Sequence, residues 1–183
     1  MRDTKEEILH FWFVESKPSQ WFQKNDTYDN QIRDRFMVTY NMARDGLCDG
    51  WNTEADGCLA LCLVLDQFPR NMFRGQPESF ATDAKALLVA KYAIAKGLDQ
   101  LLPAERRRFV YLPFEHSENL TDQKRCVALF ETIKDKDPLG LDYALRHRAV
   151  IEKFGRFPHR NAILGRENTP EEEEYLAQPD AGF

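Results

Sequence analysis

The chain has 183 residues, which fits one domain with a sizeable core, since folds of this size hide roughly 70% of their unfolded surface. Its 43% hydrophobic and 30% charged residues, with thirteen Phe, exclude a disordered chain and favour a packed protein. The net charge of −5 argues against a general nucleic-acid binder, which needs a dominant basic surface. We therefore predict a single domain, residues 1–183, without a nucleic-acid partner.

The sequence also bears on the cellular compartment. The longest apolar run, residues 58–65, is far too short to cross a bilayer. The N-terminus carries acids where a secretory signal has its apolar core. Cys58 and Cys62 have the i, i+4 spacing of a helical pair, which favours reduced structural thiols. These features predict a cytoplasmic protein with no membrane partner.

The N-terminal segment shows two helical patterns. A capping box of Thr4 and Glu7 begins a first, very apolar helix, and Pro18 marks its end. A second helix, capped by Asp26, extends to Gly46 with an apolar residue every three to four positions.

A third helix, residues 59–65, is apolar on all sides and is predicted to be the most buried. Pro69 is expected to stop it. Asp66 then meets the negative end of the helix dipole, which costs about 0.3–1 kcal/mol. We expect a nearby cation, such as Arg70 or Arg74, to offset this cost.

The second half of the chain continues with helices. The pattern predicts a fourth over residues 79–96, a short fifth from Pro103, a sixth from about residue 120 that Ser117 caps, a seventh from Pro138 to residue 154, and a last one near residues 169–172. Within the fifth, Arg106, Arg107 and Arg108 are expected to form a solvated face. We predict an all-α fold of about eight helices packed as antiparallel pairs.

Residues 154–166 (Phe-Gly-Arg-Phe-Pro-His-Arg-Asn-Ala-Ile-Leu-Gly-Arg) form the strongest candidate site. Gly155 and Pro158 end the preceding helix. Residues 146–166 carry six Arg or Lys and one acid, whereas residues 167–183 carry six acids and no base. The sequence therefore predicts a pinned cationic loop, which we call the arginine loop, beside an acidic tail.

Two earlier segments share this pattern of an aromatic residue or Leu before Pro, followed by charge: residues 66–74 (Asp-Gln-Phe-Pro-Arg-Asn-Met-Phe-Arg) and 111–118 (Tyr-Leu-Pro-Phe-Glu-His-Ser-Glu). With Phe11-Trp12-Phe13 and Leu164-Gly165-Arg166, these blocks resemble the bacterial family known as domain of unknown function 924, over essentially the whole chain. The resemblance implies a compact, tetratricopeptide-like α-α superhelix in a cytoplasmic bacterial protein, and it transfers no activity. The sequence itself shows no 34-residue repeat.

The leading functional hypothesis is one pocket for a small anionic ligand, a phosphate or a carboxylate, because guanidinium groups offer a rigid bidentate fork. The predicted ligand-binding side chains are Arg156, Arg160, Asn161, Arg166, Gln67, Arg70, Asn71 and Arg74. The candidates for proton transfer are His159, His116, Glu115, Glu118 and Asp66. No His-Glu-x-x-His spacing is present, so no metal is predicted, and any cofactor is unknown. Whether the chain is an enzyme stays open at this point.

Three alternatives stand beside this hypothesis. The arginines pair internally with Asp66, Glu115 and Glu118 and brace the ends of the helices. Alternatively, a tetratricopeptide-like module binds a peptide or partner protein in a helical groove. The third is a homo-oligomer with its polar segments at the subunit interface. His147, on an apolar helix face, is expected to be a core residue.

Overall fold

The computed structural model describes residues 3–179, 181 and 182, and every regular element within them is helical, which confirms the all-α prediction. The α-helices are α1 (Lys5–His10), α2 (Asp26–Arg44), α3 (Ala55–Cys62), α4 (Phe68–Met72), α5 (Asp83–Ala95), α6 (Ala104–Glu115), α7 (Leu120–Glu131), α8 (Pro138–Phe154) and α9 (Pro170–Leu176). Two π turns, Phe11–Glu15 and Leu63–Gln67, extend α1 and α3. In the described part of the chain, no helix combines the length and the apolar character needed to cross a bilayer.

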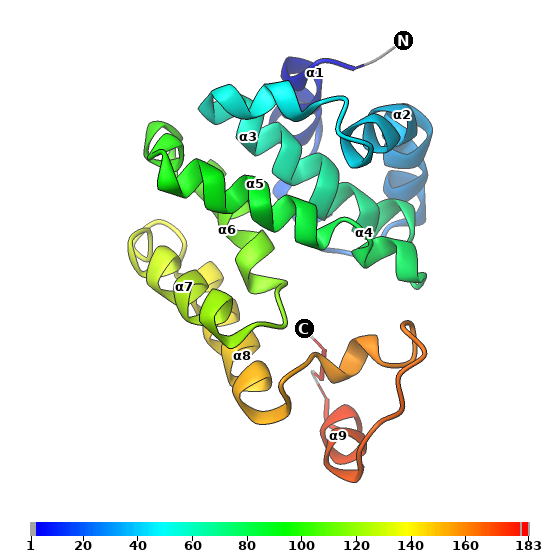
Figure 1. The fold of residues 1–183 in the computed structure, drawn as a ribbon. Coiled ribbons are helices and arrows are strands. Elements are labelled where there is room, and N and C mark those ends of the chain that lie inside the picture. The colour runs from blue at the N-terminus through cyan, green and yellow to red at the C-terminus, as the bar shows by residue number, and fades with distance from the viewer. Residues whose placement is uncertain (1–2, 180, 183) are drawn as a thin grey trace.

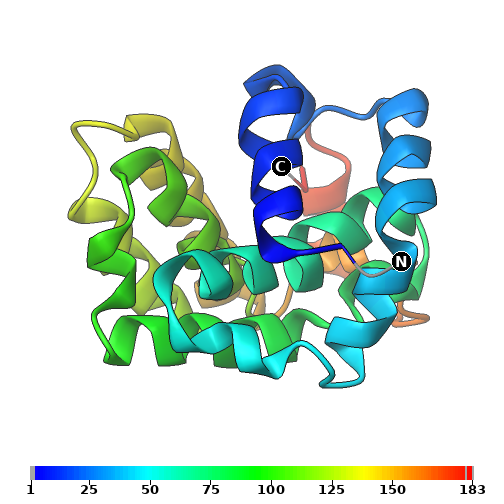
Figure 2. The same cartoon turned by 90° about the horizontal axis from the view of Figure 1, so that it is seen from above.

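The helices form one block at the N-terminal end and one farther along the chain. In Figure 1, α1 to α5 gather at the top, and Figure 2 shows the same block from above. Below it α7 packs between α6 and α8, so that α6 and α8 run in the same direction. The chain after α8 crosses under the first block before it turns back into α9.

The centre of the first block is α3, as its apolar sequence predicts. All side chains from Cys58 to Leu65 are inaccessible to solvent, which confirms that this helix is the most buried. Aromatic rings surround it: Trp12 meets Phe68 at 5.7 Å and Phe109 at 5.6 Å between ring centroids. Such edge-to-face and tilted pairs pack the core densely and hold α1, α4 and α6 together.

The third helix does not stop at Pro69, so that prediction is wrong. The chain passes from α3 through the π turn Leu63–Gln67 directly into α4. In a regular α-helix the amide of residue 69 would donate to the carbonyl of Leu65, but proline has no N–H. Instead, the hydroxyl of Thr82 donates to that carbonyl at 2.5 Å. A partner from the segment before α5 therefore allows the helix to continue.

A second proline misled the sequence prediction at the end of α6. The sequence predicted only a short helix from Pro103, whereas α6 runs through Pro113 to Glu115. The cap of α7 also differs, because Asn119 accepts hydrogen bonds from the amides of residues 121 and 122 at 2.8 and 3.4 Å. Ser117, the predicted cap, instead donates to Asp122 at 2.9 Å.

The other helix ends follow local signals. Capping boxes form at Thr4 and at Thr169, as the sequence patterns predict. Gly155 ends α8 with φ of 70°, a left-handed conformation that favours glycine. The start of α2 differs by one residue, because Asn25 rather than Asp26 accepts the capping hydrogen bond from the amide of Tyr28 at 3.0 Å.

Candidate functional site

A cavity of about 590 Å³ lies between α4, α6, α8 and the segment before α2. Its lining residues come from three stretches of chain: Arg108, Leu112 and Glu115 from α6 with His116 at its end; Leu139, Gly140, Tyr143 and His147 from α8; and Gln67, Arg70, Asn71 and Arg74 from the π turn, α4 and the turn after it. The remaining wall consists of Pro18, Ser19, Trp21, Phe22 and Gln23. The volume lies within the range of about 300–1,000 Å³ that small-molecule sites occupy.

The cavity has two ends, because it follows the parallel helices α6 and α8. At one end the Nε atom of Arg108 lies 3.3 Å from a carboxylate oxygen of Asp137, the cap of α8. At the other, Glu115 lies 3.7 Å from the Nδ1 atom of His147. The seven steps from Arg108 to Glu115 advance the backbone about 10 Å along the helix axis, at about 1.5 Å each.

Asp66 stands behind the second end of the cavity and is fully buried. Its carboxylate accepts from Nδ1 of His116 at 2.7 Å and from Gln67 at 2.6 Å, and one Nη atom of Arg70 lies 3.3 Å away. Burial by itself would raise the pKa of Asp66, but Arg70 and His116 outweigh burial and lower this pKa to about 2. Asp66 is therefore an ionised carboxylate, which agrees with the expected cation at the end of the helix.

His116 presents a second ring nitrogen in addition to the one that Asp66 holds. Burial, together with the charge of Arg70, lowers the pKa of His116 below its usual value, so the ring is neutral near pH 7. With its Nδ1 proton directed at Asp66, the Nε2 atom carries a lone pair and makes no hydrogen bond to any described residue. A neutral imidazole oriented by a carboxylate is suited to accept a proton.

Glu115 is the complementary acid in the same wall. Its side chain is buried, and its Oε2 atom has no hydrogen-bond partner within the described residues. Burial raises the pKa of Glu115 to about 8, although the positive charge of Arg108 opposes this rise. At pH 7 most Glu115 side chains are therefore protonated, and each can donate a hydrogen bond into the cavity.

Arg108 lines the cavity and does not belong to a solvated face as predicted. Its guanidinium lies over the ring of Phe22 at 5.1 Å, and neither Nη atom makes a hydrogen bond within the described chain. Neighbouring Arg107, by contrast, donates to the carbonyls of Leu102 and Gln100. The spacing of Arg108, Leu112 and Glu115 on one helix face was the available signal, but the helix was predicted to be short, so this shared face was missed.

The arginine loop lies elsewhere, and most of its polar side chains pair with acids. Arg156 forms a bidentate pair with Glu172 at 2.6 and 2.7 Å, and Arg166 forms one with Glu118 at 2.8 and 3.0 Å. Asn161 donates to Asn168 at 2.8 Å and to Glu172 at 3.2 Å. None of these side chains lines the 590 Å³ cavity. This geometry agrees with the internal pairing that the sequence left open, with Glu172 as an additional acid.

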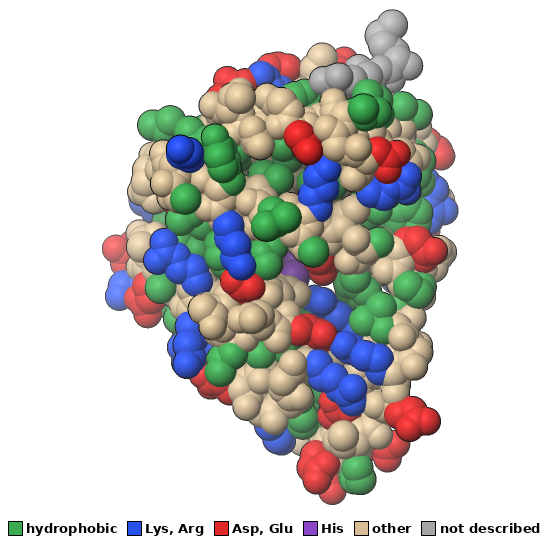
Figure 3. Space-filling model, in the orientation of Figure 1, with side chains coloured by type: hydrophobic (Ala, Val, Ile, Leu, Met, Phe, Trp, Pro, Cys, Tyr) green, Lys and Arg blue, Asp and Glu red, His purple; other side chains and the backbone are tan. Residues whose placement is uncertain are grey.

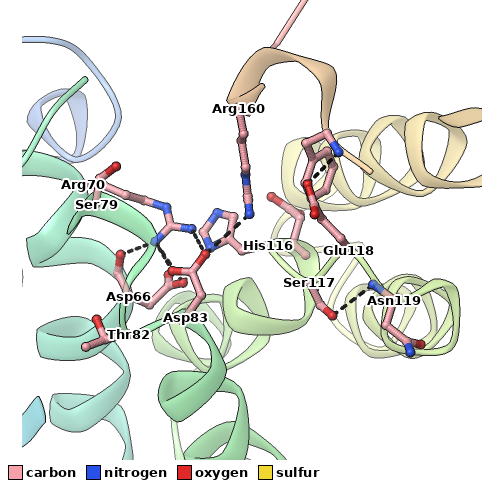
Figure 4. A network of polar contacts seen from close by, with 12 residues as sticks. Asp66, Arg70, Ser79, Thr82, Asp83, His116, Ser117, Glu118, Asn119 and Arg160 are labelled. Atoms are coloured by element: carbon pink, nitrogen blue, oxygen red, sulfur yellow. Dashed lines mark hydrogen bonds and ion pairs between the residues drawn. The ribbon is translucent and has the colours of Figure 1, made fainter. Parts of the chain in front are cut away.

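Arg160 connects the arginine loop to the cavity wall. Its guanidinium packs between Phe80 at 4.6 Å and Phe157 at 4.5 Å, and it lies 3.6 Å from a carboxylate oxygen of Asp83. Asp83 in turn accepts two hydrogen bonds from Arg70, at 2.9 and 3.0 Å. Figure 4 shows Arg70 and Arg160 reaching Asp83 from different parts of the chain, with Asp66 and His116 close by.

Of the remaining predicted residues, two line the cavity and one lies outside it. Arg74 and Asn71 line the cavity and both bind Asp29, Arg74 at 2.7 and 3.0 Å and Asn71 at 2.7 Å. His159 lies outside the lining, 5.5 Å from Phe157 between ring centroids, and burial with the charge of Arg160 lowers its pKa to about 4.

Charged side chains surround a hollow on one face of the molecule (Figure 3). In Figure 3 a histidine side chain is visible in a hollow of this face, with basic and acidic side chains around it. Among the described residues, no group of three or more His, Cys, Asp or Glu side chains is placed to hold a metal ion. His147, predicted as a core residue, is buried as expected, but it also lines the cavity.

We expect Arg156→Ala to loosen α9 specifically. The substitution removes both hydrogen bonds to the buried carboxylate of Glu172, which also completes the capping box of α9. Hydrogen exchange followed by mass spectrometry should show faster exchange in residues 170–176 and unchanged exchange in α5. Arg148→Ala, which removes a partly exposed pair with Glu152 on α8, serves as the control. Equal exchange in α9 of both variants would contradict a bracing role.

The chain is similar to proteins of one bacterial family. The model of a family described as bacterial proteins of unknown function, DUF924, matches residues 8–180. A solved structure of a protein of unknown function from Agrobacterium tumefaciens, ATU0120, is 43% identical, with a TM-score of 0.91 over 96% of this chain and 97% of that one. A search of the curated proteins found no match. The chain therefore belongs to the DUF924 family of bacterial proteins of unknown function.

Proposed function

We propose that the cavity between α4, α6 and α8 binds a small organic anion, and that His116 and Glu115 exchange protons with it. The observation that carries this proposal is the convergence of three groups in one cavity: the guanidinium of Arg108, with no hydrogen bond from its Nη atoms to described residues, a neutral His116 and a protonated Glu115. The proposal moves the anion contact from the arginine loop, where the sequence placed it, to α6.

Each group has a chemical role. Arg108 offers two parallel N–H donors to a carboxylate or phosphate, and its guanidinium lies over the ring of Phe22 at 5.1 Å. His116 accepts a proton at Nε2, and Asp66 stabilises the imidazolium that forms. Glu115 supplies a proton on the same side of the cavity. Two neighbouring groups with pKa values displaced in opposite directions are typical of acid–base pairs.

The arginine loop supports this site from a distance. Arg160 and Arg70 both contact Asp83, and Arg70 also contacts Asp66. Through Asp83, the arginine loop therefore helps to hold Arg70 in place beside Asp66. In this proposal Arg160 is a positioning residue. Ligand contacts by Arg156, Asn161 and Arg166 stay predictions, and their observed pairs with acids favour the bracing alternative.

A thermal-unfolding screen tests the binding step. Purified wild-type, Arg108→Ala and Arg106→Ala proteins would be heated with carboxylated and phosphorylated compounds. We expect at least one compound to raise the wild-type midpoint by several degrees, as a ligand at about 100 times its Kd does. The control Arg106→Ala should respond equally, because Arg106 lies over Phe13 and outside the cavity.

The same screen can refute the proposal. If no compound shifts the wild type, or if Arg108→Ala shifts as much as the wild type, the cavity is not an anion site at Arg108. A partner recovered by pull-down would then favour the predicted tetratricopeptide-like interaction module.

A further inference from the structure

We infer that the ligand is an elongated monocarboxylate whose carboxylate meets Arg108, whose apolar body crosses Leu112 and Tyr143, and whose second polar group reaches Glu115 and His116. This inference rests on the proposed function and names the ligand class of the same cavity. Three independent features of the cavity carry it: its charge balance, its apolar walls and its length.

The charge balance favours a single negative charge. Arg70 is paired with Asp66 and Asp83, and Arg74 is paired with Asp29. Of the three arginines that line the cavity, only Arg108 has no hydrogen bond from either Nη atom to a described residue, and Asp137 lies 3.3 Å from its Nε atom. A dianion such as a phosphate would meet carboxylates on several sides, whereas one carboxylate matches one guanidinium fork.

The walls between the two ends are apolar and partly aromatic. Leu112 and Tyr143 face the cavity from α6 and α8, and Trp21 closes the side. Phe22 and Leu139, which also line it, expose 54% and 59% of their surface. An apolar ligand body would cover these side chains and remove them from water, which is favourable in proportion to the area covered.

The length sets the separation of the two polar groups. The backbone positions of Arg108 and Glu115 are about 10 Å apart along the axis of α6, and this rise sets the scale of the separation. An extended chain advances about 1.2 Å per covalent bond, so about eight bonds span this distance. The cavity of about 590 Å³ holds about 20 waters at about 30 Å³ each, far more than a small inorganic anion fills.

Isothermal titration calorimetry with defined probes tests the inference on the full chain. The probes are 8-hydroxyoctanoate, the short acid 4-hydroxybutanoate, the uncharged 1,8-octanediol and inorganic phosphate. We expect 8-hydroxyoctanoate to bind the wild type at least 10-fold more tightly than each of the other three. Arg108→Ala should weaken that binding about 10- to 100-fold, whereas Arg106→Ala should leave it unchanged.

A variant in the middle of the cavity separates length from charge. Leu112→Phe should weaken the binding of 8-hydroxyoctanoate several-fold more than the binding of 4-hydroxybutanoate. Circular dichroism will verify that this variant folds. If it does not fold, the binding of the same probes to Tyr143→Phe is compared instead. If phosphate or 4-hydroxybutanoate binds as tightly as 8-hydroxyoctanoate, and Arg108→Ala loses this binding, the ligand is not elongated but the anion site remains. Failure of every anion to bind, or undiminished binding of 8-hydroxyoctanoate to Arg108→Ala, would overturn both.

Discussion

Replacing Asp66 by Asn is expected to lower the free energy of unfolding by about 3–5 kcal/mol, because removal of one partner leaves a buried cation insufficiently compensated. The Asp66 carboxylate is completely buried and receives hydrogen bonds from His116 and Gln67, with Arg70 at 3.3 Å. An asparagine of the same shape has one acceptor in place of two and brings its own N–H donors. At least one of these three partners therefore loses its acceptor.

Urea unfolding at pH 7 provides the measurement. Asp56→Asn is the matched control, because Asp56 lies on the same helix, α3, with 55% of its side chain exposed. We expect the control to change stability by less than about 1 kcal/mol, as exposed pairs usually do. Equal losses in the two variants would show that the buried network around Asp66 contributes nothing special.

The second large effect concerns pH. Between pH 6.5 and 8, wild-type stability should decrease relative to that of Glu115→Gln. Burial raises the pKa of folded Glu115 from 4.5 to about 8, so between these values the folded state holds a proton that the unfolded chain releases. The unfolded state then binds fewer protons, and the free energy of unfolding decreases as pH rises. At about 1.4 kcal/mol per pH unit, the decrease from pH 6.5 to its end near pH 8 is about 2 kcal/mol.

Other groups titrate nearby in both proteins, so the difference between wild type and Glu115→Gln isolates the contribution of Glu115. Burial lowers the pKa of His147 to about 3 and lowers that of His116, so their contribution rises with pH only up to the unfolded value near 6.5. Glu118→Gln is the control, because the pKa of Glu118 is lowered, despite its burial, by hydrogen bonds from Arg166 and the amide of Phe157. Its removal changes stability by a constant amount over this range. Unfolding in urea at half-unit pH steps will measure both slopes, and an undiminished slope in Glu115→Gln would assign the titration to another group.

Binding should follow the same titration. A ligand group that accepts a hydrogen bond from protonated Glu115 loses that donor as pH rises past about 8. Because His116 is neutral throughout this range, its capacity to accept a proton is unchanged. The pH dependence of ligand affinity therefore distinguishes the contributions of Glu115 and His116, although the two residues are adjacent in the sequence.

The sequence by itself determined the helices wherever their signals are local. The capping boxes at Thr4 and Thr169 and the glycine at position 155 depend on groups within four residues, so a single segment contains all the information. The burial of α3 was equally readable, because a helix that is apolar on every side has no other stable environment.

Only the tertiary structure decided what happens at the prolines and in the cavity. Pro69 lies within a continuing helix because Thr82, thirteen residues later, donates to the carbonyl that lacks its usual amide partner. The extension of α6 through Pro113 places Arg108, Glu115 and His116 on one face toward α8. The sequence does not reveal which arginine is available to a ligand, because this depends on the acids that packing brings near it. Glu172 and Glu118 pair with Arg156 and Arg166 of the arginine loop. Arg108, by contrast, keeps both Nη atoms without hydrogen bonds to described residues.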